Sequence, residues 1–237
     1  MAEIENAIIM GAGLGTRMRP LTYKTPKPLI KVAGKPMIES VIEGLQQNDI
    51  RDISIIVGYL AEQFNYLVEK YPGVKLINNP YYNQYNNISS LYVARNELKN
   101  TVILDGDQLV MNSKLLKKEF THSVYAGAEI EQFTDEWIMH SDQEGKILQC
   151  DRSGNDHGWR LYSLSKWRAG DSQRLKKRLE EEFEEAHHYD IYWDDIAMFD
   201  YFGEFPLYVM PIKANDIIEI DSVEQLRQVD QRLEKKG

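Results

Sequence analysis

The first half of the chain alternates short, mostly apolar runs with amphipathic stretches. An apolar run of a few residues between polar ones is typical of a buried β-strand. Four such runs occur, at residues 7–10, 53–57, 74–77 and 101–104. Apolar residues at helical spacing separate them, at residues 37–45, 60–71 and 88–98. Strands that alternate with helices predict βαβ units and a parallel sheet.

Beyond residue 120 the pattern changes to strand-like pieces. Five are predicted, at residues 123–130, 136–140, 146–150, 159–164 and 207–212. The charged stretch 171–186 has i,i+4 pairs of opposite charge, which are typical of a solvated helix face. A closing helix carries its apolar residues on one face, namely Val223, Leu226, Val229 and Leu233. We therefore predict an α/β protein with a Rossmann-like, mixed but mainly parallel sheet, helices on its faces, and a smaller β-rich extension that walls a pocket.

The most distinctive stretch is 11–29, GAGLGTRMRPLTYKTPKPL, which follows the first predicted strand. Its three glycines allow tight turns and a close approach of the backbone to a ligand. Residues 11–35 carry a charge of +6 with no acidic residue, while the whole chain carries −9, so the remainder sums to −15. A glycine-rich basic loop at the end of a strand in an acidic protein predicts a phosphate-binding site.

Composition excludes several other classes of partner. A pI near 5.2 argues against nucleic acid, because binding a phosphate backbone needs a broad basic surface. The apolar runs are far shorter than the ~20 residues that cross a bilayer, so no membrane partner is predicted. The single cysteine, Cys150, permits no internal disulfide, and the acidic N-terminus lacks the basic segment of a signal peptide, so we expect a cytoplasmic protein. No oligomeric state is predicted.

The glycine-rich stretch excludes two common phosphate loops and resembles a third motif. Thr16 stands where a dinucleotide-binding fingerprint needs its third glycine, and no G-K-[ST] string completes a Walker A loop. The stretch resembles G-x-G-[ST]-R-[ML]-x-P-L-T followed by P-K-[PA]-L, the motif of the nucleotidyltransferases that activate sugar phosphates and related alcohol phosphates. The matching residues are Gly13, Gly15, Thr16, Arg17, Pro20, Leu21, Thr22, Pro26, Lys27 and Leu29.

This resemblance implies a site for a nucleoside triphosphate and a divalent metal. Arg17 and Lys27 are the expected catalytic cations, with Lys27 near the α-phosphate. Asp107 and Asp221 are the expected metal ligands, and their hard oxygens suit Mg²⁺; Asp221 is also a candidate to cap the closing helix, beside Ser222. The expected nucleotide-binding residues are Gly11, Ala12, Gly13, Gly15, Thr16, Arg17, Lys27, Asn86, Asn87 and Asp105.

Aromatic residues adjoin carboxylates at two places in the second half of the chain. Aromatic faces with a nearby carboxylate are what a quaternary ammonium group binds, although packing of the aromatics in the core is the alternative. The expected acceptor-binding residues are Trp137, Tyr192, Trp193 and Asp194.

Several strings outside the loop are similar to those of bacterial CTP:phosphocholine cytidylyltransferases, which belong to the same superfamily. They are GYLAEQF at 58–64, YNN at 85–87, SLY at 90–92, EW at 136–137, YWD at 192–194 and EIDS at 219–222. The resemblance is weakest from about 151 to 177, where Tyr162 and Trp167 are both candidates for a further pocket aromatic. It implies a Mg²⁺-dependent enzyme that transfers CMP from CTP to phosphocholine, giving CDP-choline and pyrophosphate.

With this resemblance, residues 1–237 are expected to form one nucleotidyltransferase domain. Residues 1 to about 120 would be its nucleotide-binding half, and about 121 to 237 its acceptor-binding half. Alternative acceptors are phosphoethanolamine, 2-aminoethylphosphonate and a sugar 1-phosphate, and a non-catalytic regulatory module of the same fold is the alternative of another class. Asn86 and Asn87 would either read the cytosine base or cap the helix that follows them.

Overall fold

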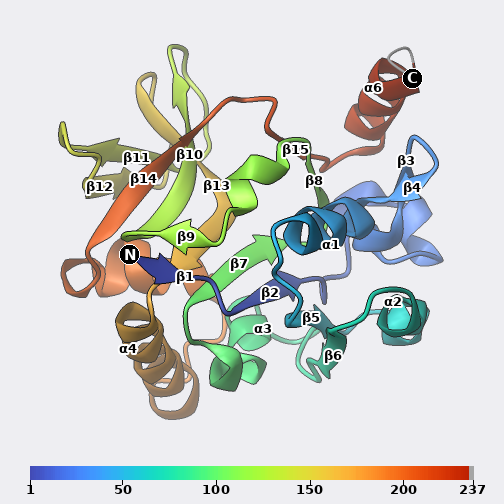
Figure 1. Ribbon diagram of the computed structural model, residues 1–237, viewed down its shortest axis with the longest axis horizontal. Coiled ribbons are helices and arrows are strands. Elements are labelled where there is room, and N and C mark those ends of the chain that lie inside the picture. Colours follow the sequence, from blue (N-terminus) through green and yellow to red (C-terminus); the bar gives the residue numbers. More distant parts are fainter. Residues whose placement is uncertain (235–237) are drawn as a thin grey trace.

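A nine-stranded mixed sheet forms the centre of the computed structural model, which describes residues 1–234 (Figure 1). The part of the sheet formed by the first half of the chain is parallel, in the order β7–β2–β5–β6. These strands are β2 (Asn6–Met10), β5 (Ile53–Val57), β6 (Val74–Asn78) and β7 (Thr101–Asp105). All four predicted runs are therefore strands. Every residue of β2 and β5 is buried, because helices cover both faces of the sheet, and this explains their continuous apolar runs.

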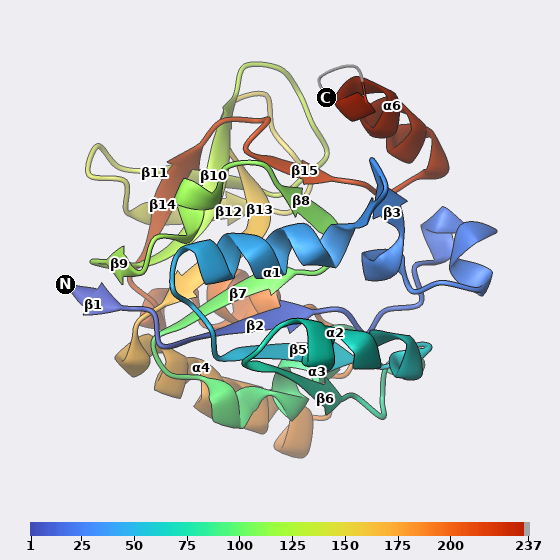
Figure 2. The ribbon, with the colours of Figure 1, turned by 45° about the vertical axis from the view of Figure 1, so that its right-hand side comes forward.

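Helices cover both faces of the parallel strands, as Figure 2 shows. One face carries α1 (Met37–Gln47) and α2 (Asn65–Lys70), and the other carries α3 (Ile88–Val93) and α4 (Ala169–Glu180). Successive side chains of a strand point to opposite faces, so Ile9 packs on the α1 side while Ile8 packs on the α3 side.

The predicted helices differ from the observed ones at their ends. Tighter 3₁₀ turns precede α2 at Ala61–Phe64 and follow α3 at Arg95–Glu97. The predicted helix 171–186 is regular only as far as Glu180 and continues as a π-helical turn, Glu181–Glu185. The spacing of apolar residues located these helices but did not distinguish α-helix from its tighter and wider relatives.

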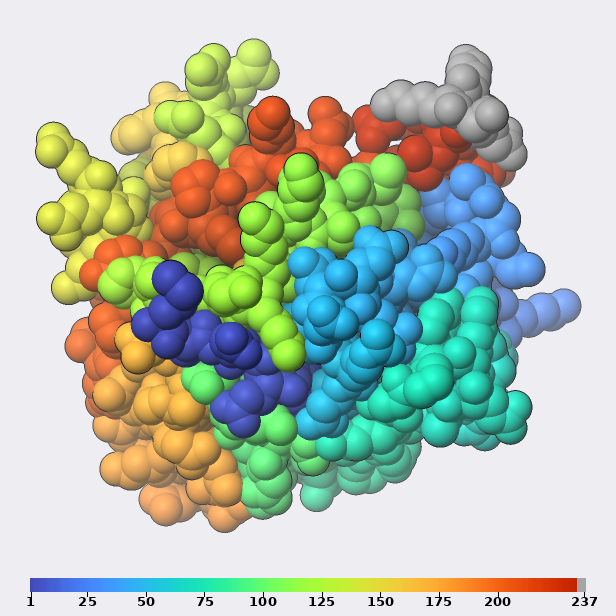
Figure 3. All heavy atoms as spheres, viewed as in Figure 1, coloured from blue at the N-terminus to red at the C-terminus, as the bar shows by residue number. Residues whose placement is uncertain are grey.

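The β-rich extension continues the same sheet. Its strands are β10 (Ser123–Ile130), β11 (Ile138–Ser141), β12 (Ile147–Asp151), β13 (Gly158–Trp167) and β14 (Leu207–Ile212). β13 pairs antiparallel with β7, and Leu164 lies opposite Leu104, so the two halves of the chain share one sheet. Their colours, blue to green and yellow to red, meet along a continuous surface in Figure 3. The predicted fold class is confirmed, while the division into a nucleotide-binding and an acceptor-binding half stays a prediction.

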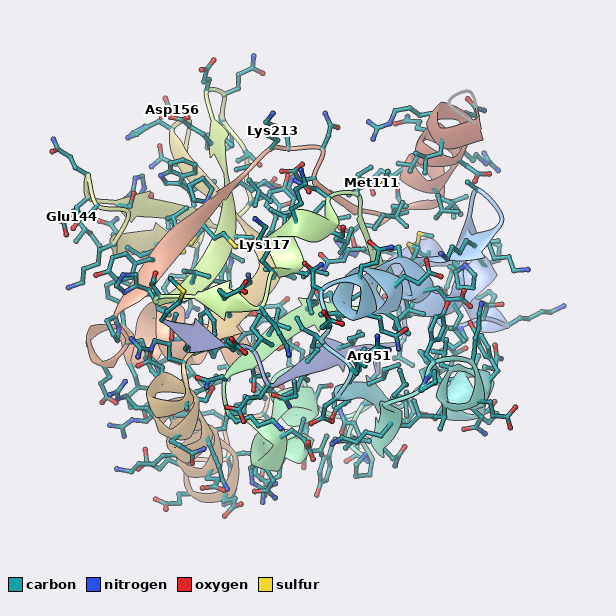
Figure 4. All side chains as sticks on the ribbon, in the orientation of Figure 1. Arg51, Met111, Lys117, Glu144, Asp156 and Lys213 are labelled. Carbon is teal, nitrogen blue, oxygen red and sulfur yellow. The ribbon has the colours of Figure 1, made fainter. Side chains whose placement is uncertain are left out.

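Three two-stranded sheets and two helices complete the described chain. They are β1 (Ala2–Glu3) with β9 (Glu119–Phe120), β3 (Lys31–Val32) with β4 (Lys35–Pro36), β8 (Gln108–Val110) with β15 (Ile217–Glu219), α5 (Trp193–Asp195) and α6 (Val223–Glu234). The pairing of β8 with β15 places Gln108 opposite Glu219. Because Gln108 closely follows the carboxyl end of β7, this pairing brings the C-terminal segment there, while Met111, labelled in Figure 4, follows the other end of β8.

Candidate functional site

The loop after β2 folds back so that two of its basic residues, Arg17 and Lys27, reach the carboxyl ends of the parallel strands. Gly15 has φ +59°, and a Cβ placed there would lie 2.9 Å from Cγ2 of Thr22 and 3.0 Å from Cβ of Lys27. The hydroxyl of Thr22 donates to the Gly15 carbonyl at 2.8 Å. Only glycine therefore allows this closed turn. The cavity inside the loop is lined by Met10, Gly11, Gly13, Gly15, Thr16, Arg17, Lys27, Pro28 and Asp107.

A compact cluster of charges joins this loop to two distant segments. Nζ of Lys27, a residue only 7% exposed, lies 2.7 Å from Oδ2 of Asp107 and 2.7 Å from Oδ1 of Asp221. Arg17 Nη2 lies 2.8 Å from the same oxygen of Asp221. Burial alone would lower the pKa of Lys27, but the two carboxylates raise it above its usual value, so the ammonium stays charged.

The side chain of Asp221 faces the site and does not cap α6. The hydroxyl of Ser222 accepts the Gln225 amide at 3.1 Å, and Oε1 of Gln225 accepts the amides of Asp221 and Ser222. This reciprocal pattern is a capping box, and it satisfies the first turn of the helix without the Asp221 carboxylate. Asp221 was expected either to bind a metal or to cap this helix. Its carboxylate does not cap the helix and is therefore available to the site.

A second cavity adjoins the loop on the β5–β6 side. The predicted nucleotide-binding residues Ala12, Gly13, Asn86, Asn87 and Asp105 line it, as does the predicted metal ligand Asp107. Residues that were not predicted also line it, namely Met10, Asn79, Tyr82, Tyr85, Ser89 and Ser90. Asn79 is fully buried, and its side-chain amide donates to the hydroxyls of Ser89 and Ser90 at 3.0 Å each. Asn79 directly follows β6, so its place at the carboxyl end of a parallel strand was a signal that could have identified it.

Asn86 and Asn87 tie this second cavity to the segment that precedes α5. The Asn86 side chain donates to the Asp190 carbonyl at 2.9 Å, and Oδ1 of Asn87 accepts the Trp193 amide at 2.9 Å. Asn87 makes no side-chain capping bond at the start of α3, while Oδ1 of Asn86 accepts the Asn87 amide at 2.7 Å. The structure therefore does not support the capping alternative for Asn87.

A third cavity, larger and acidic, lies beyond the charge cluster. It is lined by Arg17, Lys27, Asn87, Asp105, Asp107, Gln108, Glu136, Trp137, Leu161, Ser163, Tyr192, Asp194, Glu219 and Asp221. Trp137 and Tyr192 meet edge to face there, with ring centroids 6.0 Å apart and planes at 88°. Three of the four predicted acceptor-binding residues, Trp137, Tyr192 and Asp194, thus lie around one cavity.

Trp193 does not reach this cavity. It is 4% exposed and packs in the core, with its ring 6.2 Å from Tyr125 and 6.1 Å from Trp167. Its neighbour Tyr192 is exposed because consecutive residues at the start of a helix point in different directions. The structure therefore supports the alternative that Trp193 packs in the core and does not line the acceptor pocket.

Neither aromatic candidate of the weakly matching stretch lines the acidic cavity. Tyr162 is buried beneath the guanidinium of Arg160, whose Cζ is 4.7 Å from the ring, and Trp167 is buried in the core. Leu161 and Ser163 line the cavity instead. Because side chains alternate along a strand, Tyr162 points to the opposite face of β13.

Six carboxylates and only two cations line the acidic cavity, and burial raises the pKa of three of these carboxyl groups. Burial raises the pKa of Asp194 to about 7, and the Tyr125 hydroxyl donates to it at 2.7 Å. Burial also raises the pKa of Glu219 to about 7, although Arg160 lies 2.7 Å from it. Burial and the adjacent Asp107 raise the pKa of Asp105 well above its usual value. The cavity therefore favours a positively charged ligand.

The arrangement suits transfer between two anionic groups. A phosphate cavity and an acidic cavity share Arg17, Lys27 and Asp107, so a ligand in one is brought against a ligand in the other. The shared cations can bind phosphate oxygens of both. The carboxylates of the acidic cavity can attract a positively charged part of the second ligand.

Comparison with known proteins agrees with this geometry. The family model for nucleotidyl transferases matches residues 6–134, and the chain belongs to that family. The chain is 41% identical over 231 residues to 2-aminoethylphosphonate cytidylyltransferase of Lancefieldella rimae, covering 97% of this chain and 93% of that protein. It is 38% identical over 231 residues to choline-phosphate cytidylyltransferase of Streptococcus pneumoniae, covering 98% and 99%.

A solved structure shows the same likeness in three dimensions. The structure of CTP:phosphocholine cytidylyltransferase from Streptococcus pneumoniae superposes with a TM-score of 0.91 at 38% identity, covering 98% of this chain and 99% of that one. In the described part of this chain, no helix has the length and apolar character that a bilayer crossing requires.

Gly15→Ala should impair nucleotide use far more than a matched glycine change. An alanine there would be strained by the positive φ and would press on Thr22 and Lys27. Gly34 has φ +80° but open space around its Cβ, so Gly34→Ala carries the strain without the clash. We expect Gly15→Ala to lower kcat/KM for nucleotide by roughly tenfold or more, as loss of more than ~1.4 kcal/mol would. Steady-state rates of both variants check this, and equal rates would contradict it.

Proposed function

We propose that this protein is a cytidylyltransferase that transfers CMP from CTP to phosphocholine, with release of pyrophosphate. The observation that carries the proposal is the junction of two cavities at Lys27, one lined by a basic glycine-rich loop and the other by aromatics and carboxylates. A cytoplasmic location is part of the proposal, because CTP is an intracellular substrate.

The chemistry is an in-line displacement at the α-phosphorus of CTP. A phosphate oxygen of phosphocholine forms the new bond to phosphorus as the bond to the β-phosphate bridging oxygen breaks, and the electron pair leaves with pyrophosphate. The acceptor phosphate has a second pKa near 6 and is already a nucleophile at pH 7, so no general base is needed. Lys27 and Arg17 stabilise the negative charge that develops, while the loop backbone and Thr16 hold the triphosphate.

Asp107 and Asp221 are the residues that would hold a divalent cation. Both carboxylates pair with the Lys27 ammonium at 2.7 Å, so their oxygens lie close enough together to share one cation. Mg²⁺ commonly binds one or two carboxylates and completes its shell with phosphate oxygens and water, so this donor pair fits it. Within residues 1–234 no cluster of three or more His, Cys, Asp or Glu side chains forms a candidate metal site. A bound Mg²⁺ would neutralise phosphate charge and favour departure of pyrophosphate.

The head group of the acceptor would lie between Trp137, Tyr192 and Asp194. Two aromatic rings at right angles offer faces to a trimethylammonium group, and a cation–π contact to a desolvated cation contributes up to about 2 kcal/mol. The carboxylate of Asp194 adds charge attraction. Asn86, Asn87 and the residues that line the second cavity would bind the cytidine.

A primary-amine acceptor, 2-aminoethylphosphonate, is the second candidate. With Trp193 in the core, the acidic cavity offers two aromatic rings but three carboxylates besides those at the strand ends and in the charge cluster, namely Glu136, Asp194 and Glu219. Carboxylates can accept the N–H bonds of a primary ammonium, which an aromatic cage leaves unpaired at ~1–3 kcal/mol. The relative from L. rimae is named for this acceptor.

A substrate matrix tests the proposal and separates the two candidates. Each of four nucleoside triphosphates is mixed with phosphocholine, phosphoethanolamine, 2-aminoethylphosphonate or glucose 1-phosphate, and pyrophosphate is measured. We expect CTP with phosphocholine to give the highest kcat/KM, at least tenfold above phosphoethanolamine, which corresponds to ~1.4 kcal/mol. Preference for 2-aminoethylphosphonate would support the second candidate, and no release with any pair would refute an enzymatic function.

Lys27→Ala should lower kcat more than it raises KM for CTP. Its charge acts mainly on the transition state, and loss of such a contact typically costs on the order of 10²–10³ in rate. Lys24 is an exposed lysine on the same loop, so Lys24→Ala is the matched control and should behave like the wild type. A change confined to KM would make Lys27 a ground-state binder and leave Arg17 as the catalytic cation.

Acceptor binding should strengthen as the pH rises through about 7. Below that pH the Asp194 carboxyl, whose pKa burial raises to about 7, is protonated, and above it the carboxylate attracts the cationic head group. KM for phosphocholine should therefore fall between pH 6 and 8 in the wild type. Asp194→Asn should have a higher KM and lose this part of the dependence, while the titration of the acceptor phosphate remains common to both. Parallel pH profiles for the two proteins would remove Asp194 from head-group binding.

A further inference from the structure

An ion pair between a half-exposed guanidinium and a buried carboxylate lies behind the aromatic residues of the acidic cavity. Arg152 lies in the turn between β12 and β13, and its Nη2 is 2.8 Å from Oδ1 of Asp195 in α5. The Asp195 side chain is 4% exposed, whereas that of Arg152 is 52% exposed. Within the described residues Oδ1 of Asp195 is buried and accepts no hydrogen bond, so the ion pair with Arg152 is the contact that compensates its charge. The pair lies outside the proposed reaction chemistry, since neither residue lines a substrate cavity.

Asp195 fixes the backbone that presents Tyr192. Its second oxygen, Oδ2, accepts the Tyr192 amide at 2.7 Å, while the Asp195 amide donates to the Tyr192 carbonyl at 3.1 Å. These two bonds lock the residue that precedes the short helix α5. The orientation of the Tyr192 ring therefore depends on where the Asp195 carboxylate is held.

Arg152 supports the other wall through a stack of rings. Its Cζ lies 4.0 Å from the centroid of Phe199 and 6.0 Å from that of Trp137. Phe199 meets Trp137 edge to face, with centroids 4.9 Å apart and planes at 86°. Because Trp137 in turn meets Tyr192, the contacts form a closed ring that runs from Arg152 through Asp195, Tyr192, Trp137 and Phe199 back to Arg152.

The turn that carries Arg152 is itself anchored to the loop that carries Trp137. Asn155 exchanges two backbone hydrogen bonds with Thr134, at 3.1 and 3.2 Å, and its side chain donates to Asp151 at 2.8 Å. Asp156, labelled in Figure 4, marks this turn at the outer end of the extension. Arg152 thus couples the β12–β13 turn and the Trp137 loop to α5, three segments that are separate in sequence.

We propose that Arg152 and Asp195 are positioning residues that set the geometry of the acceptor pocket by holding Trp137 and Tyr192 at right angles. The inference rests on the proposed function, because it concerns the acceptor of that same reaction. It assigns specificity for the cationic head group to residues that do not touch it. A planar guanidinium suits this role, since it stacks on an aromatic face while it pairs with a carboxylate.

The test compares Arg152→Met, Asp195→Asn and the double variant with the wild type. Methionine keeps most of the length of the arginine side chain, and asparagine keeps an oxygen for the Tyr192 amide, so each change removes mainly the charge pairing and the guanidinium stack. We expect each single variant to raise KM for the acceptor about tenfold, a change of ~1.4 kcal/mol. KM for CTP should stay within about twofold of the wild-type value, because these substitutions weaken binding of the acceptor and leave the nucleotide site intact. The double variant should be no worse than the worse single one, since the two residues act as a unit.

Arg174→Met is the matched control. Arg174 also pairs with an acidic residue, Asp171 at 2.6 Å, and lies over a phenylalanine, Phe205 at 5.9 Å, but it lies outside the ring of contacts around the acceptor pocket. This variant should leave both KM values unchanged. Calorimetric titration of each variant with the acceptor, in the presence of a non-hydrolysable CTP analogue, gives the same comparison without turnover.

Three results would overturn the inference. They are an unchanged acceptor KM in Arg152→Met, an equal rise in KM for CTP, and an equal effect of Arg174→Met. Each is distinct from failure of the proposed function, in which the wild-type protein itself releases no pyrophosphate with any acceptor of the matrix.

Discussion

The contact of one lysine with two aspartates is the constraint on which the site depends. Lys27 comes from the loop after β2, Asp107 follows β7, and Asp221 precedes α6, so a single ammonium joins three segments that are up to 194 residues apart in sequence. Partial burial strengthens these charge interactions relative to those at an open surface. Each carboxylate also needs the cation, because burial raises the cost of its charge. The segment that contains Asp221 and leads into α6 is therefore held at the site by its ion pairs with Lys27 and Arg17.

Two structural features make that contact possible. Gly15 allows the loop to turn back closely enough for Lys27 to reach the carboxyl ends of the strands, and the β8–β15 pairing carries Asp221 to the same place. Parallel strands end at one edge of a sheet, so the parallel topology alone brings the loops after β2, β6 and β7 together there. This is why residues as distant as Gly13, Asn79 and Asp105 line one cavity.

The sequence predicts the parts of this structure that depend on local pattern. The apolar runs located β2, β5, β6 and β7, because a strand buried on both faces must be apolar throughout. The loop motif located Lys27, because the strained turn beside it requires glycine. Side-chain direction at an irregular segment has no such local cause. Trp193 and Tyr192 are adjacent and both aromatic, yet one packs on Tyr125 and the other is exposed. Asn86 and Asn87 look like helix caps locally, but their partners are about 100 residues away.

The two sides of the reaction are built in physically different ways, and this bears on how acceptor specificity arises. The triphosphate side consists largely of backbone and of side chains fixed by a tight turn, so few substitutions there preserve the loop. The aromatic residues of the acidic cavity come from the Trp137 loop and the start of α5, and the β12–β13 turn supports them from behind through stacking and the Arg152–Asp195 pair. Such contacts can be replaced one at a time while the shared charge cluster stays in place. Relatives named for different acceptors at 41% and 38% identity are what this division would produce.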